Sequence, residues 1–172
     1  LGGICLNWGC IPTKTLLKNA EVYSYIKNSK KYGINVEKIS LDTIKNIKRS
    51  REVSKRLSKG IEYLIKKNNI FHIRGEAKLK NKNEIMVNSN GNSNLIESDY
   101  IILATGARPK TFPGFNMDNK RIISSKEAML LEKIPKKIVI IGSGAIGCEF
   151  SYYFNEFGAK VHLIESEEKI LP

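Results

Sequence analysis

The sequence predicts an α/β fold, because segments with the periodicity of helices alternate with strand-like apolar runs. Residues 137–165 have the order of a strand, a glycine-rich turn, a helix and a second strand. Two amphipathic helices are predicted before residue 70, and short runs separated by Asn, Ser and Gly predict an antiparallel meander after them. The chain has 172 residues, of which 41% are apolar and 27% charged, a composition that fits one domain or two small ones.

Two segments near the N-terminus have apolar residues at three- and four-residue spacing, the pattern of amphipathic helices. The first predicted helix covers residues 12–27, with Pro12 in its first turn, where the missing N–H of proline costs no hydrogen bond. The second covers residues 41–68, with Lys and Arg on its outer face. Its apolar stripe consists of Ile44, Ile47, Val53, Leu57, Ile61, Leu64 and Ile65. We expect this stripe to face the core.

Short β-like runs follow the second helix and predict a small antiparallel meander. These runs are Ile70–Arg74, Glu84–Val87 and Leu95–Glu97. The apolar run Asp99–Ala104 predicts a buried strand, and the proline-containing segment Pro109–Asn119 predicts a crossover linker. We therefore expect a first domain at residues 1–110 and a second at residues 111–172.

The C-terminal part is predicted to contain a short helix, a strand, a longer helix and a second strand. These elements are Ser125–Leu131, Lys137–Ile141, Gly142–Phe157 and Lys160–Glu165. The longer helix begins with the motif Gly142-Ser143-Gly144-Ala145-Ile146-Gly147. This order of elements around a glycine-rich turn is typical of a Rossmann-like dinucleotide-binding unit.

Each glycine of this motif has a physical role in binding the pyrophosphate of a dinucleotide. Gly142 permits the tight turn, Gly144 lets the backbone approach the pyrophosphate, and Gly147 allows close packing of helix on strand. Glu165 stands 23 residues after Gly142, where a carboxylate accepts hydrogen bonds from ribose hydroxyls and repels a 2′-phosphate. The motif therefore predicts NAD rather than NADP, with a glycine-containing turn that binds no ligand as the alternative.

The chain is basic, with 29 Lys and Arg against 17 Asp and Glu and a formal net charge of +12. Its lysines are scattered without Arg clusters or interleaved aromatic residues, which favours a solvated basic surface over nucleic-acid binding. No apolar run approaches the ~18 residues that span a bilayer. Three cysteines are too few for a disulfide-stapled secreted domain, and no secretory signal is recognisable. We expect a protein of the cytoplasm or an organellar matrix that binds neither membranes nor nucleic acid.

Four residues separate Cys5 from Cys10, and Cys10 lies at the start of the first predicted helix. The positive end of a helix dipole lowers the pKa of a thiol and favours a reactive thiolate. The alternatives are a zinc site, which the two histidines in separate segments disfavour, and two inert buried thiols. Cys148 is interpreted as a small packing residue without a redox role.

The N-terminal segment Gly2-Gly3-Ile4-Cys5-Leu6-Asn7-Trp8-Gly9-Cys10-Ile11-Pro12-Thr13-Lys14 resembles the redox-disulfide signature of the flavin-dependent pyridine nucleotide–disulfide oxidoreductases. The resemblance extends to Ala104-Thr105-Gly106-Ala107-Arg108-Pro109, to the fingerprint Gly142–Glu149 and to Glu165. It therefore covers the whole chain, in the order that the family has. It implies incomplete Rossmann-like domains for FAD and NAD(P), with the meander in the FAD domain.

The resemblance also implies roles for individual residues. Cys10 is implied to be the cysteine next to the flavin, and Cys5 the thiol that exchanges with the substrate, the two forming a redox disulfide. Lys14 is implied to lie by the FAD, paired with Glu149 of the nucleotide helix. The further residues implied to contact FAD are Ala77, Thr105 and Gly106. Those implied to contact NAD are Gly142, Gly144, Ala145, Ile146, Gly147, Glu149 and Glu165.

The family branch that the chain most resembles oxidises dihydrolipoamide, carried on lipoyl domains of 2-oxo acid dehydrogenase complexes, and works as a homodimer. Electrons are implied to pass from the dithiol to the Cys5–Cys10 disulfide, then to FAD and to NAD. The alternatives are an NADPH-dependent glutathione or mercuric reductase, which Glu165 argues against, a truncated fragment without catalysis, and a basic nucleic-acid-binding module. The family's glycine-rich FAD unit is expected before Leu1, and its dimerisation domain, with a His-Glu acid–base pair, after Pro172. The sequence lacks both, so we expect these residues alone to be inactive.

Overall fold

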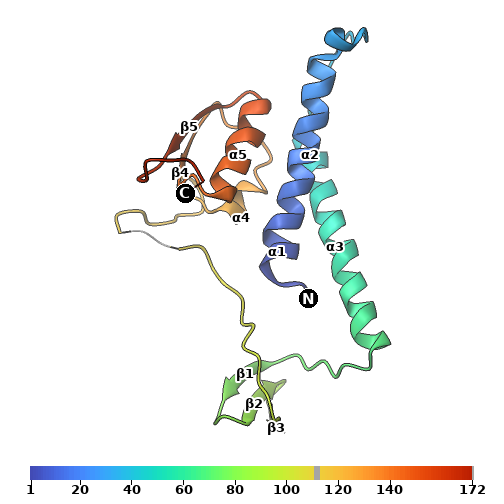
Figure 1. Ribbon diagram of the computed structural model, residues 1–172, viewed down its shortest axis with the longest axis vertical. Helices are drawn as coiled ribbons and strands as arrows, with labels where there is room; N and C mark the ends of the chain where they lie inside the picture. Colours follow the sequence, from blue (N-terminus) through green and yellow to red (C-terminus); the bar gives the residue numbers. More distant parts are fainter. Residues whose placement is uncertain (111–112, 172) are drawn as a thin grey trace. The chain divides into compact units, whose positions relative to one another are not determined.

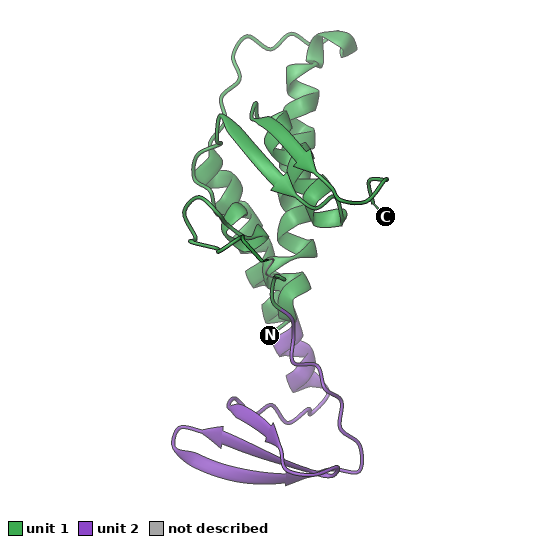
Figure 2. Ribbon diagram, turned by 90° about the vertical axis from the view of Figure 1, so that its left-hand side faces the viewer, with its two compact units in different colours: residues 1–60, 108–172 green, residues 61–107 purple. Residues whose placement is uncertain are grey.

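The computed structural model describes residues 1–110 and 113–171. The chain divides into two compact units, residues 1–60 with 108–172 and residues 61–107 (Figures 1 and 2). It combines helices with one parallel and one antiparallel sheet, which confirms the predicted α/β class. The predicted domain boundary between residues 110 and 111 adjoins residues 111 and 112, which lie outside the described part of the chain, and it stays a prediction.

The N-terminal segment of the first unit is helical throughout, apart from one break at a glycine. Helix α1 (Gly3–Trp8) is followed at once by α2 (Cys10–Lys27) and by the 3₁₀ turn η1 (Ser29–Tyr32). The predicted helix at 12–27 is thus confirmed, whereas α1 was not predicted because six residues are too few to show helical periodicity.

Helix α3 (Thr43–Lys67) confirms the second predicted helix, but its buried face differs from the prediction. Its buried side chains are Ser50 and Ser54, whereas Ile44 and Leu64 of the apolar stripe are 60% and 52% exposed. Arg49 donates to the Asn19 side chain of α2 and Arg51 donates to the Asn7 carbonyl of α1, so polar contacts join α3 to the first two helices. The expectation that the whole stripe faces the core is therefore wrong for this chain.

The remainder of the first unit is a βαβ unit preceded by a short helix. Helix α4 (Ser125–Ala128) ends three residues before the predicted bound, and Ser124 and Glu127 form a capping box at its start. Strands β4 (Lys137–Ile141) and β5 (Lys160–Ile164) pair in parallel, and α5 (Ala145–Glu156) connects them. The predicted strand–helix–strand order is confirmed.

The hydrophobic core of the first unit forms where α2 packs against α5 (Figure 1). Tyr23 of α2 contacts Phe157 at 5.2 Å between ring centroids, and Tyr153 contacts Phe154 at 5.1 Å. Burial raises the pKa of Tyr153 to about 12. The buried core residues are Leu16, Ala20, Ala128, Met129, Phe150, Tyr153, Phe154 and Ala159. This core joins the cysteine-bearing helix to the glycine-rich unit.

The second unit contains the predicted antiparallel meander, with one strand displaced. Strands β2 (Glu84–Ser89) and β3 (Asn92–Glu97) confirm two predicted runs, but the first strand is β1 (Glu76–Leu79) and not Ile70–Arg74. Gly75 lies against β2 at the start of the ladder, because an added Cβ would stand 2.6 Å from the Asn88 carbonyl oxygen. Pairing with β2 determines which residues form the first strand. The local sequence of β1 does not predict this pairing.

The expected buried strand at Asp99–Ala104 is absent. In this segment, Tyr100 is 89% exposed and Ile102 is 91% exposed. An apolar run becomes a central strand only where neighbouring strands pair with its backbone, and no described strand pairs with this one.

Phe154→Ala is expected to destabilise the first unit by about 3–5 kcal/mol, because it removes a fully buried ring from the α2–α5 core. Hydrogen exchange of the α5 amides measures this loss. Tyr152→Ala, on the same helix but 42% exposed, is the matched control and should have a much smaller effect. Equal losses for the two variants would show that the core lies elsewhere.

Candidate functional site

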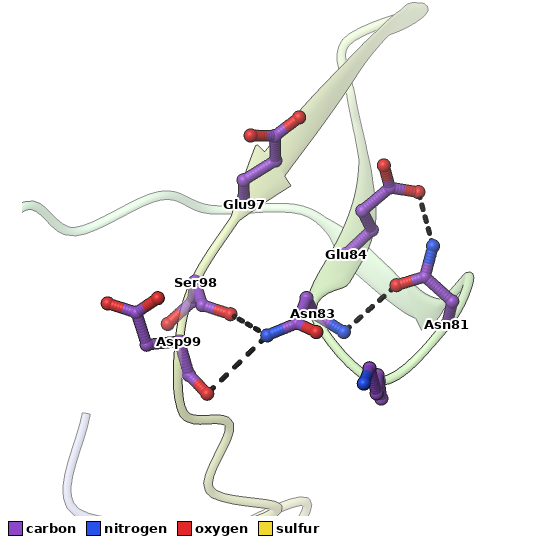
Figure 3. Close-up of a pocket in the computed structure, with 7 residues that line it drawn as sticks. Asn81, Asn83, Glu84, Glu97, Ser98 and Asp99 are labelled. Carbon is purple, nitrogen blue, oxygen red and sulfur yellow. Dashed lines mark hydrogen bonds between the residues drawn. The ribbon is translucent and has the colours of Figure 1, made fainter.

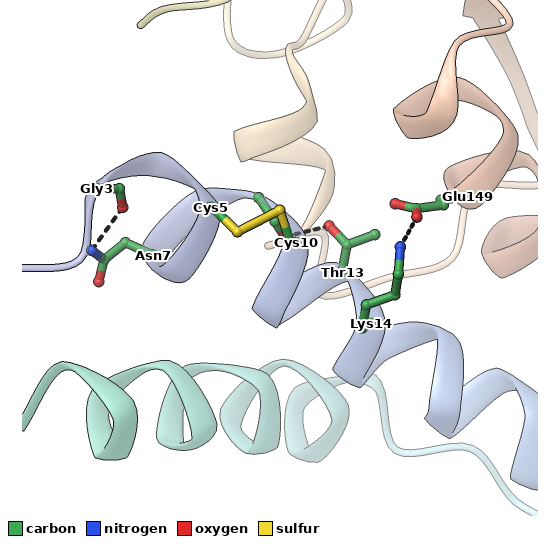
Figure 4. Close-up of a disulfide and its surroundings, with 8 residues drawn as sticks. Gly3, Cys5, Asn7, Cys10, Thr13, Lys14 and Glu149 are labelled. Carbon is green, nitrogen blue, oxygen red and sulfur yellow. Dashed lines mark hydrogen bonds and ion pairs between the residues drawn. A yellow bond between two sulfur atoms is a disulfide. The ribbon is translucent and has the colours of Figure 1, made fainter. Parts of the chain in front are cut away.

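Cys5 and Cys10 form a disulfide that links α1 to the first residue of α2 (Figure 4). Their Cα atoms are 4.7 Å apart, within the range that a disulfide requires. Gly9 interrupts the helical conformation between α1 and α2. A Cβ added at Gly9 would stand 3.1 Å from both the Ile4 carbonyl oxygen and Cys5 Cα. Glycine at this position therefore lets α1 fold back closely enough for the sulfurs to meet.

Hydrogen bonds hold both ends of the disulfide segment. The Asn7 side chain donates to the Gly3 carbonyl at 2.9 Å and to the Leu1 carbonyl at 3.0 Å. At the start of α2, the Thr13 hydroxyl donates to the Gly9 carbonyl at 2.8 Å. Cys10 is the first residue of α2, so on reduction its thiol stands at the positive end of the helix dipole.

Lys14 and Glu149 form an ion pair between α2 and α5, as expected (Figure 4). Lys14 follows Cys10 by one helical turn, so both side chains lie on the same face of α2. The Glu149 side chain is 19% exposed and that of Lys14 is 63% exposed. The pair aligns the disulfide helix with the first turns of the helix that follows the glycine-rich motif.

The glycine-rich loop has the geometry that a dinucleotide requires. Gly142 has a φ of +98°, a conformation that favours glycine, and no atom lies within 4 Å of a Cβ added at Gly144. A Cβ at Gly147 would overlap the Gly142 carbonyl oxygen, so helix and strand approach each other too closely for a side chain. Ala145 and Ile146 form the first turn of α5. The loop therefore fits a bound pyrophosphate.

Glu165, directly after β5, is held by the loop itself. Its Oε2 accepts from the backbone N–H and the hydroxyl of Ser143 at 2.6 and 2.7 Å. Its Oε1 accepts from the backbone N–H groups of Ser166 and Glu167 at 2.7 and 3.1 Å. The Ser143 bonds, followed by the other two, lower the pKa of Glu165 to about 2. The carboxylate is therefore ionised and oriented at the end of the strand.

Ser143 is a site residue that the sequence analysis did not single out. It is fully buried between the first two glycines, and only the folded loop reveals its contact with Glu165. A carboxylate has about four lone-pair positions, and these donors, together with the Ser166 hydroxyl at 3.2 Å, fill them. A ribose diol can bind Glu165 only if it replaces a donor, and the Ser143 hydroxyl can rotate away. Cys148 donates its thiol to the Ser143 carbonyl at 3.1 Å, consistent with a packing role.

The residues expected to contact FAD outside the disulfide helix lie in the second unit. Ala77 is in β1, and Thr105 and Gly106 follow the meander in a segment without regular secondary structure. Gly106 has a φ of +83° and open space beside its Cα, which allows a ligand to approach the backbone closely. These residues fit an FAD-binding role, which stays a prediction.

A shallow hollow at one end of the meander contains none of the predicted site residues (Figure 3). Asn83 donates to the Ser98 carbonyl at 2.9 Å and Asn81 donates to Glu84 at 2.6 Å, so its polar groups stabilise the turn. Its lining residues are Asn81, Lys82, Asn83, Glu84, Glu97, Ser98 and Asp99. Residues 1–110 and 113–171 contain no group of three or more His, Cys, Asp or Glu that could hold a metal ion.

The sequence profile of the pyridine nucleotide-disulphide oxidoreductases matches residues 1–172. The chain belongs to this family. Membership makes it part of an oxidoreductase and implies FAD and NAD as cofactors. The redox-active disulfide and the flavoprotein class expected from the sequence are thereby supported.

The curated relatives are longer than this chain. Dihydrolipoyl dehydrogenase from Chlorobaculum parvum is 44% identical over 173 residues, which cover 100% of this chain and 37% of the relative. Dihydrolipoyl dehydrogenase from Bacillus subtilis is 37% identical, over 100% of this chain and 38% of the relative. This chain thus spans less than two fifths of the length of either relative.

Two solved structures show the same fold. LpdA from Mycobacterium tuberculosis has a TM-score of 0.90 at 22% identity, covering 100% of this chain and 38% of its own. The HOCl-induced flavoprotein disulfide reductase RclA from Escherichia coli has a TM-score of 0.78 at 30% identity, covering 100% and 35%. In the part of the chain that the structure describes, no helix is both long and apolar enough to cross a membrane.

Ser143→Ala is expected to raise the pKa of Glu165 from about 2 towards its usual 4.5, because one donor to the carboxylate is lost and the backbone N–H remains. The donors stabilise the ionised form, so their contribution to stability is complete above the usual pKa and is lost as the pH falls towards 2. Carboxyl NMR titration measures the shift. Ser166→Ala, whose hydroxyl stands 3.2 Å from the other carboxylate oxygen, should change the pKa less. An unchanged pKa in Ser143→Ala would contradict the assigned contact.

Gly144→Ala and Gly147→Ala are expected to separate ligand binding from folding. Gly147→Ala should destabilise the βαβ unit, because its Cβ overlaps a backbone carbonyl. Gly144→Ala should leave the melting temperature within a few degrees while weakening NAD binding at least tenfold, because its Cβ occupies the space meant for the pyrophosphate. Thermal unfolding and NAD titration of both variants distinguish the two effects. Unaltered NAD binding in Gly144→Ala would show that the loop does not hold the pyrophosphate.

Proposed function

We propose that the chain is the disulfide-exchange and NAD-binding part of an enzyme that oxidises dihydrolipoamide to lipoamide and reduces NAD. The Cys5–Cys10 disulfide at the start of α2 carries this proposal, because it is the group that reacts with the substrate dithiol. Identity to dihydrolipoyl dehydrogenases over the full length of the chain supports this substrate over other disulfides and dithiols.

The first half-reaction is a thiol–disulfide exchange. One substrate thiolate attacks Cys5 Sγ, the bond between Cys5 and Cys10 breaks, and Cys10 leaves as a thiolate. The second substrate thiolate then attacks the substrate sulfur of the mixed disulfide and releases Cys5. The products are lipoamide and the two reduced cysteines, so two electrons have moved to the enzyme, and the two protons given up by the substrate thiols go to the cysteine thiolates or to water. The dipole of α2 favours the Cys10 thiolate, which makes it the better leaving group.

FAD, when bound, supplies the two-electron step between the dithiol and NAD. Lys14 would place its ammonium near the flavin, and its ion pair with Glu149 would fix the ammonium in position. Ala77, Thr105 and Gly106 would contact the FAD through exposed backbone. Oxidation of the two thiols to the disulfide returns the cysteines to their starting state.

The nucleotide preference follows from Glu165. Its pKa of about 2 keeps the carboxylate ionised at neutral pH, where it would face the adenosine ribose. A ribose diol can donate to it, whereas a 2′-phosphate would be repelled, so NAD is preferred over NADP. Gly142, Gly144 and Gly147 would give the pyrophosphate access to the N-terminus of α5, with Ala145 and Ile146 in its first turn.

We further propose that the substrate dithiol is carried by lipoyl domains of 2-oxo acid dehydrogenase complexes, and that the enzyme works as a homodimer. The support is the identity to dihydrolipoyl dehydrogenases along the whole chain. A disulfide that cycles through a dithiol fits a reducing compartment, namely the cytoplasm or an organellar matrix.

Dihydrolipoamide is expected to open the Cys5–Cys10 disulfide in the protein expressed as the full product of its gene. Anaerobic incubation, alkylation and mass spectrometry should show both cysteines newly alkylated, and NAD should then be reduced in turnover. Cys5→Ser and Cys10→Ser should abolish turnover, whereas Cys148→Ser, the matched third cysteine, should retain it. Alkylation of both cysteines after reduction with NADPH, together with NADPH oxidation by oxidised glutathione and no reaction with dihydrolipoamide, would replace this proposal by a glutathione-reductase-type function.

A further inference from the structure

Arg51 of α3 contacts the chain between the two cysteines at two points. Its Nη1 donates to the Asn7 carbonyl at 2.6 Å. Its guanidinium carbon stands 4.6 Å from the centroid of the Trp8 ring. Asn7 and Trp8 are the last two residues of α1, directly before the break at Gly9. The side chain therefore holds the point at which α1 turns back towards Cys10.

Both contacts are strong for their kind. The Asn7 carbonyl is one of the terminal carbonyls of α1 that have no partner within the helix, and a cation is a favourable donor to it. Nε and Nη2 of Arg51 are buried and have no hydrogen-bond acceptor among the described residues, which leaves the Trp8 ring as their neighbouring π system. Lys126 of α4 also stands 4.6 Å from the Trp8 centroid.

The same face of α3 contacts the N-terminal residues at a second point. Ser58, two turns further along α3, donates to the Leu1 carbonyl at 3.1 Å. Between the two lies Ser54, which is 4% exposed. Figure 4 shows α3 running beside α1 and the start of α2. One polar face of α3 therefore anchors residues 1–8 at both ends.

We propose that Arg51 is a positioning residue that keeps Cys5 and Cys10 close together and so favours the disulfide over the dithiol. This inference rests on the proposed function, in which the pair cycles between these two states. Reduction breaks the covalent link, and after that only non-covalent contacts determine how close the two sulfurs stay. When Arg51 holds Trp8 in place, the two thiols stay close together. Their effective concentration is then high, which favours re-formation of the disulfide.

Arg51→Met removes the cation and the donor but keeps an apolar stem. In the full product of the gene, we expect the equilibrium with dithiothreitol to shift about tenfold towards the protein dithiol, a shift of about 30 mV. In this exchange dithiothreitol becomes its cyclic disulfide and the protein disulfide becomes two thiols, which alkylation and mass spectrometry count. Arg51→Lys retains a cation and a donor and should return the equilibrium to within about threefold of the wild type.

Arg49→Met is the matched control on the same helix. Arg49 donates to Asn19 at 3.0 Å and to the Thr15 carbonyl at 3.5 Å, both beyond the disulfide segment. Its loss also weakens the contact between α3 and α2 but should leave the dithiothreitol equilibrium unchanged. If Arg51→Met fails to fold, Trp8→Leu tests the same contact from the other side and should shift the equilibrium in the same direction.

The outcomes separate this inference from the proposed function. An unchanged equilibrium in Arg51→Met, or in Trp8→Leu when it is the variant used, overturns the positioning role but leaves the proposed function standing. An equal shift in Arg49→Met also overturns it, because any loosening of α3 would then suffice. A wild-type disulfide that neither dithiothreitol nor dihydrolipoamide opens would overturn the proposed function itself.

Discussion

The packing of α2 against α5 is the constraint on which the rest of the first unit depends. It buries Leu16 and Ala20 of one helix against Phe154 of the other. Because α2 begins at Cys10 and α5 begins in the glycine-rich loop, this single apolar contact joins the redox-active disulfide and the nucleotide loop in one body. Hydrophobic packing is not directional, so the Lys14–Glu149 ion pair helps to fix the register of α2 against α5.

The two ends of this body, the disulfide and the nucleotide loop, are held by hydrogen bonds from neighbouring backbone and side chains. At the disulfide, Asn7 and Thr13 satisfy carbonyl groups on both sides of the Gly9 break, and Arg51 reaches the same segment from α3. At the nucleotide end, Ser143 orients the Glu165 carboxylate. At the disulfide, this arrangement fixes the reacting cysteines before a substrate arrives, which reduces the cost of ordering them during binding.

Helix α3 contacts α1 and the chain before it through polar side chains. Arg51 and Ser58 donate to the main-chain carbonyls of Asn7 and Leu1, and Ser50 and Ser54 are buried. Leu57 and Leu64 remain substantially exposed on another face. Polar contacts with defined geometry therefore help to set the position of α3.

Local residue patterns were sufficient to predict the α/β class, the two long helices and the βαβ unit, whereas the Cys5–Cys10 disulfide was implied by the resemblance to the family. Helical periodicity and the glycine spacing are properties of neighbouring residues, so they can be recognised from the sequence without knowledge of the fold. The register of β1, the exposed run at Asp99–Ala104, the buried face of α3 and the contact of Ser143 with Glu165 were decided by tertiary structure. Each depends on which distant backbone or side chain lies opposite, and pairing across space leaves no trace in the order of residues along the chain.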